Sequence, residues 1–277
     1  MSERIFTAAI WAAALLVAGV FCFLLGDLVR QGAPHLSWRF LLTAPADAGR
    51  AGGISSIVIS TLLILAVAMV VAVPSGLGAA LWLAEYARGK HAARRAIRLS
   101  LDVLAGVPSI VFGLFGNAFF CIFLGLGFSI LSGGLTLACM VLPILIRTSE
   151  AGLSAVTEEW RRDAAALGMT RAAALWHILL PAAAPAITAG LILGMGRAIA
   201  ETAALLFTSG YVDRMPNSLY DSGRSLSVHI YDLSMNVAGG DVAAHASALV
   251  LVSLIVVLNG GALVLSDRWA TRKITVS

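Results

Sequence analysis

The feature that most constrains this chain is an apolar run over residues 103–146 that contains no charged residue. A bilayer core about 30 Å thick is crossed by roughly 20 helical residues that each rise about 1.5 Å. The run is therefore long enough to cross a membrane twice, and we predict one span over 103–125 and another over 133–146. The reversal between them is assigned to Gly125, Gly127, Gly133 and Gly134.

Four further apolar segments extend this pattern along the chain: 5–26, 54–84, 182–209 and 247–265. Only 12% of the residues are charged and the mean hydropathy is +0.91, whereas about 25% of residues are charged in a soluble domain. The pattern predicts an all-α polytopic membrane protein with six transmembrane helices and one domain, 1–277, with its core over about 52–266. No cleavage pattern follows the first segment, so we expect a retained span rather than a signal peptide.

The distribution of Lys and Arg predicts the orientation of the spans, because cytoplasmic loops are enriched in these residues. With the N-terminus inside, thirteen of them fall inside and five outside, and Arg197 lies within a span. Both termini are therefore expected in the cytoplasm. The expected inside loops are 85–102 and 147–181, and the expected outside loops are 27–53 and 210–244.

The inside loop 147–181 has the character of a docking element. Its alanine-rich segment 160–167 favours a helix, Gly168 is able to end that helix with a positive φ, and Thr170 is placed to cap a second helix over 171–180. A partner groove would receive apolar side chains from Leu167, Met169, Leu175, Trp176, Ile178 and Leu179. The alternative is an amphipathic loop on the bilayer surface, anchored by Trp160 and Trp176.

Arg197 and Glu201 are the charges expected within the fifth span, at positions i and i+4 of one helix face. A charge inside a membrane is costly, so such a pair marks a candidate functional site. Arg197 offers a donor fork suited to an oxyanion, and Glu201 would hold Arg197 when no anion is bound. Hydroxyls of Thr202, Thr208 and Ser209 are candidate additions, and Ser109 is a candidate lining residue next to Pro108. The alternative is a static ion pair that joins two spans.

Other classes of protein lack support in the residues. The three cysteines lie in apolar runs and the histidines are scattered, so no metal site is expected. No G-x4-G-K-[ST] loop is present, so we expect no ATP site. No nucleophile is paired with a base at a suitable spacing, so we expect neither an enzyme nor a catalytic residue. A self-contained secondary transporter would need an inverted repeat, and none is evident.

The spacing G-x9-I-x-L-P, formed by Gly168, Ile178, Leu180 and Pro181, resembles the cytoplasmic loop of bacterial ABC importer permeases. The resemblance implies a type I permease fold and docking of this loop onto an ATP-binding subunit. The acidic residue of the family pattern falls on Arg162 here. The nearest acid is Asp163, which is followed by Ala164, so these two residues complete the predicted coupling segment.

Two further segments, 105–115 (AGVPSIVFGLF) and 197–208 (RAIAETAALLFT), resemble permeases of the phosphate-uptake family, A type. The resemblance implies a phosphate permease in the bacterial inner membrane with four kinds of partner: a second homologous permease, two ATP-binding subunits, an outside phosphate-binding protein and the lipid bilayer. ATP and Mg²⁺ would be used by the partner ATPase, with no cofactor bound by this chain and no nucleic acid. The alternatives are a related oxyanion (phosphonate, phosphite, sulfate or molybdate) or a secondary transporter.

Overall fold

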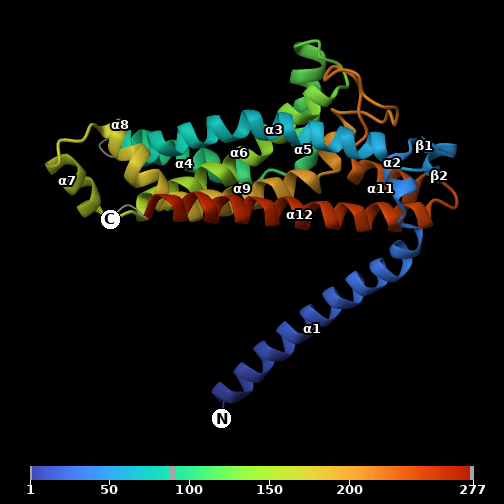
Figure 1. The fold of residues 1–277 in the computed structure, drawn as a ribbon, viewed down its shortest axis with the longest axis horizontal. Coiled ribbons are helices and arrows are strands. Elements are labelled where there is room, and N and C mark those ends of the chain that lie inside the picture. Colours follow the sequence, from blue (N-terminus) through green and yellow to red (C-terminus); the bar gives the residue numbers. More distant parts are fainter. Residues whose placement is uncertain (1, 88–90, 275–277) are drawn as a thin grey trace.

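The computed structural model describes residues 2–87 and 91–274, and the side chains of 4–87 and 92–264. Long helices lie side by side in a bundle, with short elements at both of its ends (Figure 1). The long helices are α1 (Ser2–Gly32), α3 (Ser55–Leu81), α4 (His91–Gly106), α6 (Ile130–Ala155), α9 (Leu180–Ile199) and α12 (Asp241–Ile274). The described residues thus confirm the all-α prediction, with five helices long and apolar enough to cross a membrane and a bent pair as the sixth candidate.

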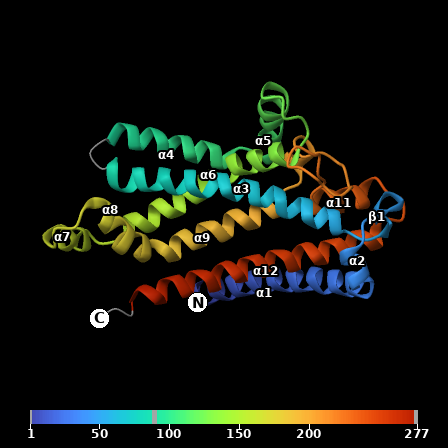
Figure 2. The same ribbon diagram turned by 45° about the horizontal axis from the view of Figure 1, so that its top comes forward.

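The shorter elements gather at the two ends of the bundle. One end carries α7 (Glu158–Ala166), α8 (Arg171–Ala174) and the π-helical turns η3 (Trp82–Tyr86) and η5 (Leu175–Leu179); we call it the α7 end. Near the other end lie α2 (Trp38–Leu42), α10 (Ala203–Leu206), α11 (Leu226–Met235), the single turns η1 (Ala33–His35) and η2 (Asp47–Gly49), and the antiparallel strands β1 (Pro45–Ala46) and β2 (Ala51–Gly52). The last described turns of α12 lie toward the α7 end, and α1 starts about midway along the bundle (Figure 2).

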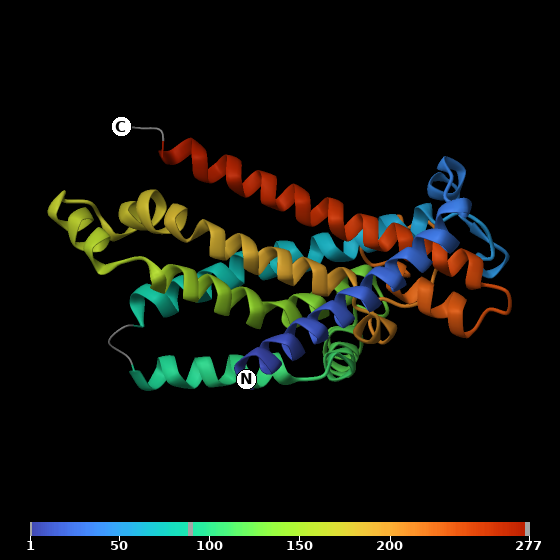
Figure 3. The ribbon, with the colours of Figure 1, turned by 90° about the horizontal axis from the view of Figure 1, so that it is seen from below.

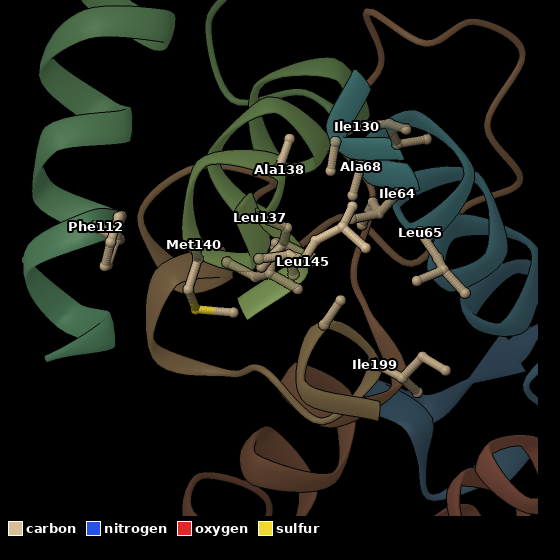
Figure 4. Close-up of a cluster of buried hydrophobic side chains, with 14 of the residues drawn as sticks. Ile64, Leu65, Ala68, Phe112, Ile130, Leu137, Ala138, Met140, Leu145 and Ile199 are labelled. Atoms are coloured by element: carbon tan, nitrogen blue, oxygen red, sulfur yellow. The ribbon is translucent and has the colours of Figure 1, made fainter. Parts of the chain in front are cut away.

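Helix α6 is the centre of the bundle and packs against α3 on one side and α9 on the other. Small residues allow the close approach: a methyl group on Gly194 of α9 would lie 2.6 Å from Cγ1 of Val141 on α6. The apolar core between these helices includes Ile64, Leu137 and Ile199 (Figure 4).

Helix α1 stands apart from the bundle. It diverges from α12, which it contacts, and crosses the other helices obliquely (Figures 1 and 3). Gly32 sits against His245 and Leu249 of α12, whereas large apolar side chains along α1, such as Trp11, are more than half exposed. The predicted first span is confirmed as a helix and extends beyond 5–26 at both ends.

The predicted span over 103–125 is wrong as one continuous helix. Helix α4 ends at Gly106, and α5 (Ser109–Gly116) continues through the π-helical turn η4 (Asn117–Phe123) at 100° to it. Pro108 explains the break, because its ring disfavours helical geometry at the residue before it. The expected loop 85–102 is mostly helical as well, since α4 begins at His91.

Three other predicted boundaries also change. Helix α6 continues to Ala155, nine residues into the expected loop 147–181. The fifth span ends at Ile199 rather than at 209, and the expected outside loop 210–244 contains α11 and the start of α12. Gly125 and Gly127 have positive φ and form the predicted reversal, whereas Gly133 and Gly134 lie inside α6 and pack against Ser209 and Val67.

A buried histidine, His229, lies in α11, outside the membrane-spanning helices and near the end of the bundle opposite the α7 end. His229 has no exposed surface, its Nε2 has no hydrogen-bond partner, and its Nδ1 lies 3.5 Å from a guanidinium nitrogen of Arg224. Burial, reinforced by Arg224, lowers the pKa of His229 to about 4 against the opposing effect of Asp232 and Asp213. His229 is therefore neutral in the folded protein at ordinary pH.

This pKa predicts acid sensitivity of the fold. The unfolded chain takes up the His229 proton near pH 6.5, whereas the folded chain resists it down to about pH 4. Stability is therefore complete above about pH 6.5 and falls by up to about 3 kcal/mol as the pH drops toward 4. Thermal unfolding between pH 4.5 and 7.5 should show a shallower pH slope for His229→Phe than for the wild type. Equal slopes would contradict this assignment.

Candidate functional site

The predicted docking element forms a helix, a tight turn and a second helix, as its sequence indicates. Gly168 has a φ of +71°, its N–H donates to the carbonyl of Ala165, and the next N–H, of Met169, donates to Ala164. This pair of bonds is the glycine-dependent way of ending a helix, here α7. Thr170 then accepts a hydrogen bond from the N–H of Ala173 at 3.2 Å and caps α8, as predicted.

The apolar residues of this segment divide between two roles. Leu175, Leu179 and Leu180 are buried in a core cluster of the chain itself, with Ile178 packed against it. Leu167 is 78% exposed and Trp176 61% exposed. The interpretation that all six apolar residues are available to a partner is therefore wrong for the buried ones, and the I-x-L part of the motif anchors the segment to its own bundle. Asp163 and Arg162 are exposed, and Ala164 is buried.

Pro181 does not end a helix. The predicted helix over 171–180 continues through η5 into α9, so that one helical stretch runs from Arg171 to Ile199. In η5 the N–H of Leu180 donates to the carbonyl of Leu175, five residues earlier. This widened turn directly before Pro181 accommodates a residue that has no N–H and whose ring crowds the preceding turn.

Sequence reasoning did not identify the residue that holds the docking element in place, which is Arg161. Its guanidinium donates to the Glu85 carboxylate at 2.9 Å and to the carbonyls of Leu153 and Val156 at 2.8 and 2.5 Å. One side chain, 11% exposed, thereby joins η3 and the end of α6 to α7. The sequence pattern does not reveal this role, because Glu85 lies 76 positions away and the two carbonyls become acceptors only through the turn between α6 and α7.

A hollow of about 390 Å³ lies between η3, α7 and α8. Glu85 and Arg161 line one part of it, and Met169, Arg171 and Leu175 line another. The docking element thus lines one side of a small cavity and presents exposed side chains, such as Leu167, at the turn between its helices.

The predicted pair of Arg197 and Glu201 does not share a helix face. Arg197 lies in the last turn of α9, which ends at Ile199, and Glu201 lies in the break before α10. No ion pair joins them in the described part of the chain. Instead, Glu201 Oε1 accepts the N–H of Ala204 at 3.1 Å, and the Glu201 carbonyl accepts the hydroxyl of Ser227 at 2.5 Å. The i, i+4 argument fails because α9 ends at Ile199, between the two residues.

Arg197 is half-buried and has no hydrogen-bond or ion-pair partner among the described residues. The negative end of the α9 dipole lies at its own last turn and favours a cation there. Glu201 is half-buried too, but its carboxylate is engaged as a cap of α10. The guanidinium therefore keeps its whole donor fork available to a ligand.

The other predicted path residues belong to two short helices that pack together, α5 and α10. Ser109 begins α5, and a methyl on Gly113 one turn later would lie 2.8 Å from Cα of Ala204 in α10. Thr202 precedes α10 and is half-buried. Thr208 and Ser209 are fully buried, and their hydroxyls donate to carbonyls of α10, so these two hydroxyls are occupied within the chain.

Within residues 2–87 and 91–274, no three His, Cys, Asp or Glu side chains gather as metal ligands would.

The fold is shared with a solved transporter. It resembles the crystal structure of a bacterial ABC transporter involved in the import of the acidic polysaccharide alginate, with a TM-score of 0.60 and 17% sequence identity over 96% of this chain and 98% of that one. The long apolar helices and this likeness define a multi-pass membrane protein with the type I ABC permease fold.

The sequence comparisons identify the family. The family described as "Binding-protein-dependent transport system inner membrane component" matches residues 73–271. The chain is 29% identical to the probable ABC transporter permease protein YqgI of Bacillus subtilis, over 97% of this chain and 95% of that protein. It is 35% identical to the phosphate transport system permease protein PstA of Mycobacterium leprae, over 80% and 73%. The chain therefore belongs to this family and is a permease of an ABC importer.

Proposed function

We propose that this chain is the permease subunit of an ATP-driven importer for inorganic phosphate, in which it lines the translocation path and couples that path to a cytoplasmic ATPase. The observation that carries the proposal is Arg197, whose guanidinium has no partner among the described residues and lies in the last turn of α9, just before the helix breaks. A guanidinium stays charged and binds oxyanions through parallel hydrogen bonds. The phosphate permease relatives in several mycobacteria support phosphate as the anion.

In the proposed assembly, the two ends of the bundle bind different partners. A second, homologous permease would complete the path, and two ATP-binding subunits would contact the exposed turn around Leu167 and Gly168. An extracytoplasmic phosphate-binding protein would meet the loops 27–53 and 210–244. This arrangement puts the α7 end and both termini in the cytoplasm of a bacterial inner membrane. ATP and Mg²⁺ would be bound by the partner ATPase.

Ser109 and Thr202 are proposed to face the path beside Arg197, because α5 and α10 pack against each other. Glu201 would position this region through its bond to Ala204. Since a carboxylate repels an oxyanion, we assign Glu201 no direct contact with phosphate.

A related oxyanion is the second candidate, because a single guanidinium binds sulfate or phosphonate by the same chemistry. We expect the importer, reconstituted in proteoliposomes with its binding protein, to take up phosphate in preference to phosphonate, phosphite, sulfate and molybdate. The measurement is uptake of each labelled anion with and without ATP. Preferential uptake of another anion would replace phosphate in the proposal, and uptake without ATP would contradict ABC coupling.

The proposed docking contact predicts the effect of Gly168→Pro. Proline fixes φ near −65°, whereas Gly168 has a φ of +71° and donates its N–H to Ala165. The variant should lose the turn between α7 and α8, and the ATPase should no longer co-purify with the permease.

Gly239→Pro is the matched control for this experiment. Gly239 also has a positive φ, +76°, and has open space around it, but it lies at the opposite end of the bundle. The control variant should keep the ATPase. Full retention of the ATPase by Gly168→Pro would disprove the docking role of this turn.

A further inference from the structure

Three arginines gather on the first two turns of α4. Arg94, Arg95 and Arg98 line a hollow of about 800 Å³ together with Leu99 and Asp102. Helix α4 contacts α6, and Figure 2 shows its first residues toward the α7 end. Neither the coupling segment nor the path around Arg197 uses these side chains.

A buried carboxylate fixes two of the three arginines. Glu150 of α6 has a side chain only 3% exposed, and its Oε1 accepts bonds from both neighbours. Arg98 donates through Nε and Nη2 at 2.9 and 2.6 Å, and Arg94 donates through the same two atoms at 3.4 and 3.2 Å. Both guanidinium groups are therefore already held in place. Because of this, they lose less conformational entropy when a ligand binds.

Part of the donor capacity of these arginines remains unused. The Nη1 group of Arg94 and that of Arg98 have no acceptor in the described part of the chain, and Arg95 is exposed with no partner there. Three guanidinium charges face one carboxylate, Glu150, so the cluster keeps an excess of two positive charges. Asp102 does not offset it, because this residue pairs with Arg147.

An apolar surface adjoins the charged cluster on the same helix. Leu99 is 62% exposed and Val103 63% exposed. The combination of a fixed positive cluster with an apolar strip is typical of a site at the membrane surface, where the charge meets headgroups and the strip meets acyl chains.

We propose that Arg94, Arg95 and Arg98, organised by Glu150, form a second binding site for a phosphate-type oxyanion at the α7 end of the protein. The forks suit the oxygens of a phosphate group. Two sources carry this chemistry: the headgroup of an anionic phospholipid and free inorganic phosphate. The proposal does not rest on phosphate as the transported substrate, because it uses none of the residues around Arg197.

The test is residue-resolved labelling of arginines by phenylglyoxal in the purified importer complex, read out by mass spectrometry after chymotryptic digestion. One sample is in zwitterionic phosphatidylcholine nanodiscs with or without inorganic phosphate, and the other is in nanodiscs that contain phosphatidylglycerol. Arg4 is the reference, since it is an exposed arginine in the first turn of α1. A bound ligand slows labelling by 1 + [L]/Kd, which is about tenfold at ten times Kd.

We expect Arg95 to be protected at least about fivefold more than Arg4. Protection by inorganic phosphate in phosphatidylcholine identifies a free anion as the ligand, and protection only in phosphatidylglycerol identifies a headgroup. The variant Arg98→Gln should reduce the protection of Arg95 to the level of Arg4. Equal protection of Arg95 and Arg4 in both membranes would overturn the proposal, as would an Arg95 that is unreactive without any ligand. Labelling of Arg197 is resolved in the same spectra. A lack of phosphate binding at Arg197 is therefore distinguished from a lack of ligand binding at the arginines of α4.

Discussion

Arg197→Gln is expected to reduce phosphate uptake by at least about 100-fold, because it removes a charged donor that makes two hydrogen bonds worth about 1.5–3 kcal/mol each. The folded chain provides no partner for this guanidinium among its described residues, so the variant should assemble and unfold at the same temperature as the wild type. The measurement is ATP-dependent uptake in proteoliposomes, with the amount of assembled complex determined in parallel.

Two variants sharpen this experiment. Arg197→Lys keeps the charge but loses the fork, and its uptake should fall between those of the wild type and Arg197→Gln. Arg4→Gln removes an exposed arginine near the start of α1 and should transport normally. Normal transport by Arg197→Gln would show that the oxyanion does not pass through this guanidinium, and the path would have to be sought elsewhere on α5 and α10.

Glu150→Ala is expected to lower the stability of the permease by about 3 kcal/mol, since it leaves two guanidinium groups without the carboxylate between them. Arg94, Arg98 and the buried Leu101 form the face of α4 that meets α6. Loss of the carboxylate should therefore loosen α4 from the bundle. We expect the midpoint of thermal unfolding in detergent to fall by about 6 °C or more, with faster hydrogen exchange over 94–104.

The pair of Asp102 and Arg147 supplies the matched control, because it also joins α4 to α6 but is solvent-exposed, at 52% and 40%. Asp102→Ala should cost less than about 1 kcal/mol, as exposed pairs do. If both variants lower the midpoint equally, burial of Glu150 is not the reason for its effect. If neither does, α4 is held by its apolar contacts alone.

The sequence predicted the apolar helices but not the positions at which they break. The charge-free run 103–146 correctly indicated a reversal at Gly125 and Gly127 and a membrane helix after it, but not the break in its first half. The 100° angle at Pro108 depends on where α5 finds a surface to pack on, which is α10. In the same way, α9 ends just before Glu201, whose carbonyl accepts the hydroxyl of Ser227, and this contact across 26 positions is not visible from the local pattern.

The docking element shows the opposite case. The turn at Gly168 and the cap at Thr170 are local devices that involve residues within a few positions of one another, and both were predicted correctly. Arg161 escaped notice because its partners, Glu85, Leu153 and Val156, belong to the ends of two other helices. Arg161 connects α7 to these helix ends and belongs to no sequence motif.

The sequence alone determined the class of this protein, the existence of its membrane helices and the turn of its docking element. The physical reason is that a helix in lipid must satisfy its backbone hydrogen bonds within its own segment, so length and apolar composition suffice to reveal it. Only the tertiary structure decided where helices bend or end and which charges pair. Arg197 is left without Glu201, and Glu150 gains Arg94 and Arg98, because charge pairing depends on the distance between segments that are far apart in the chain.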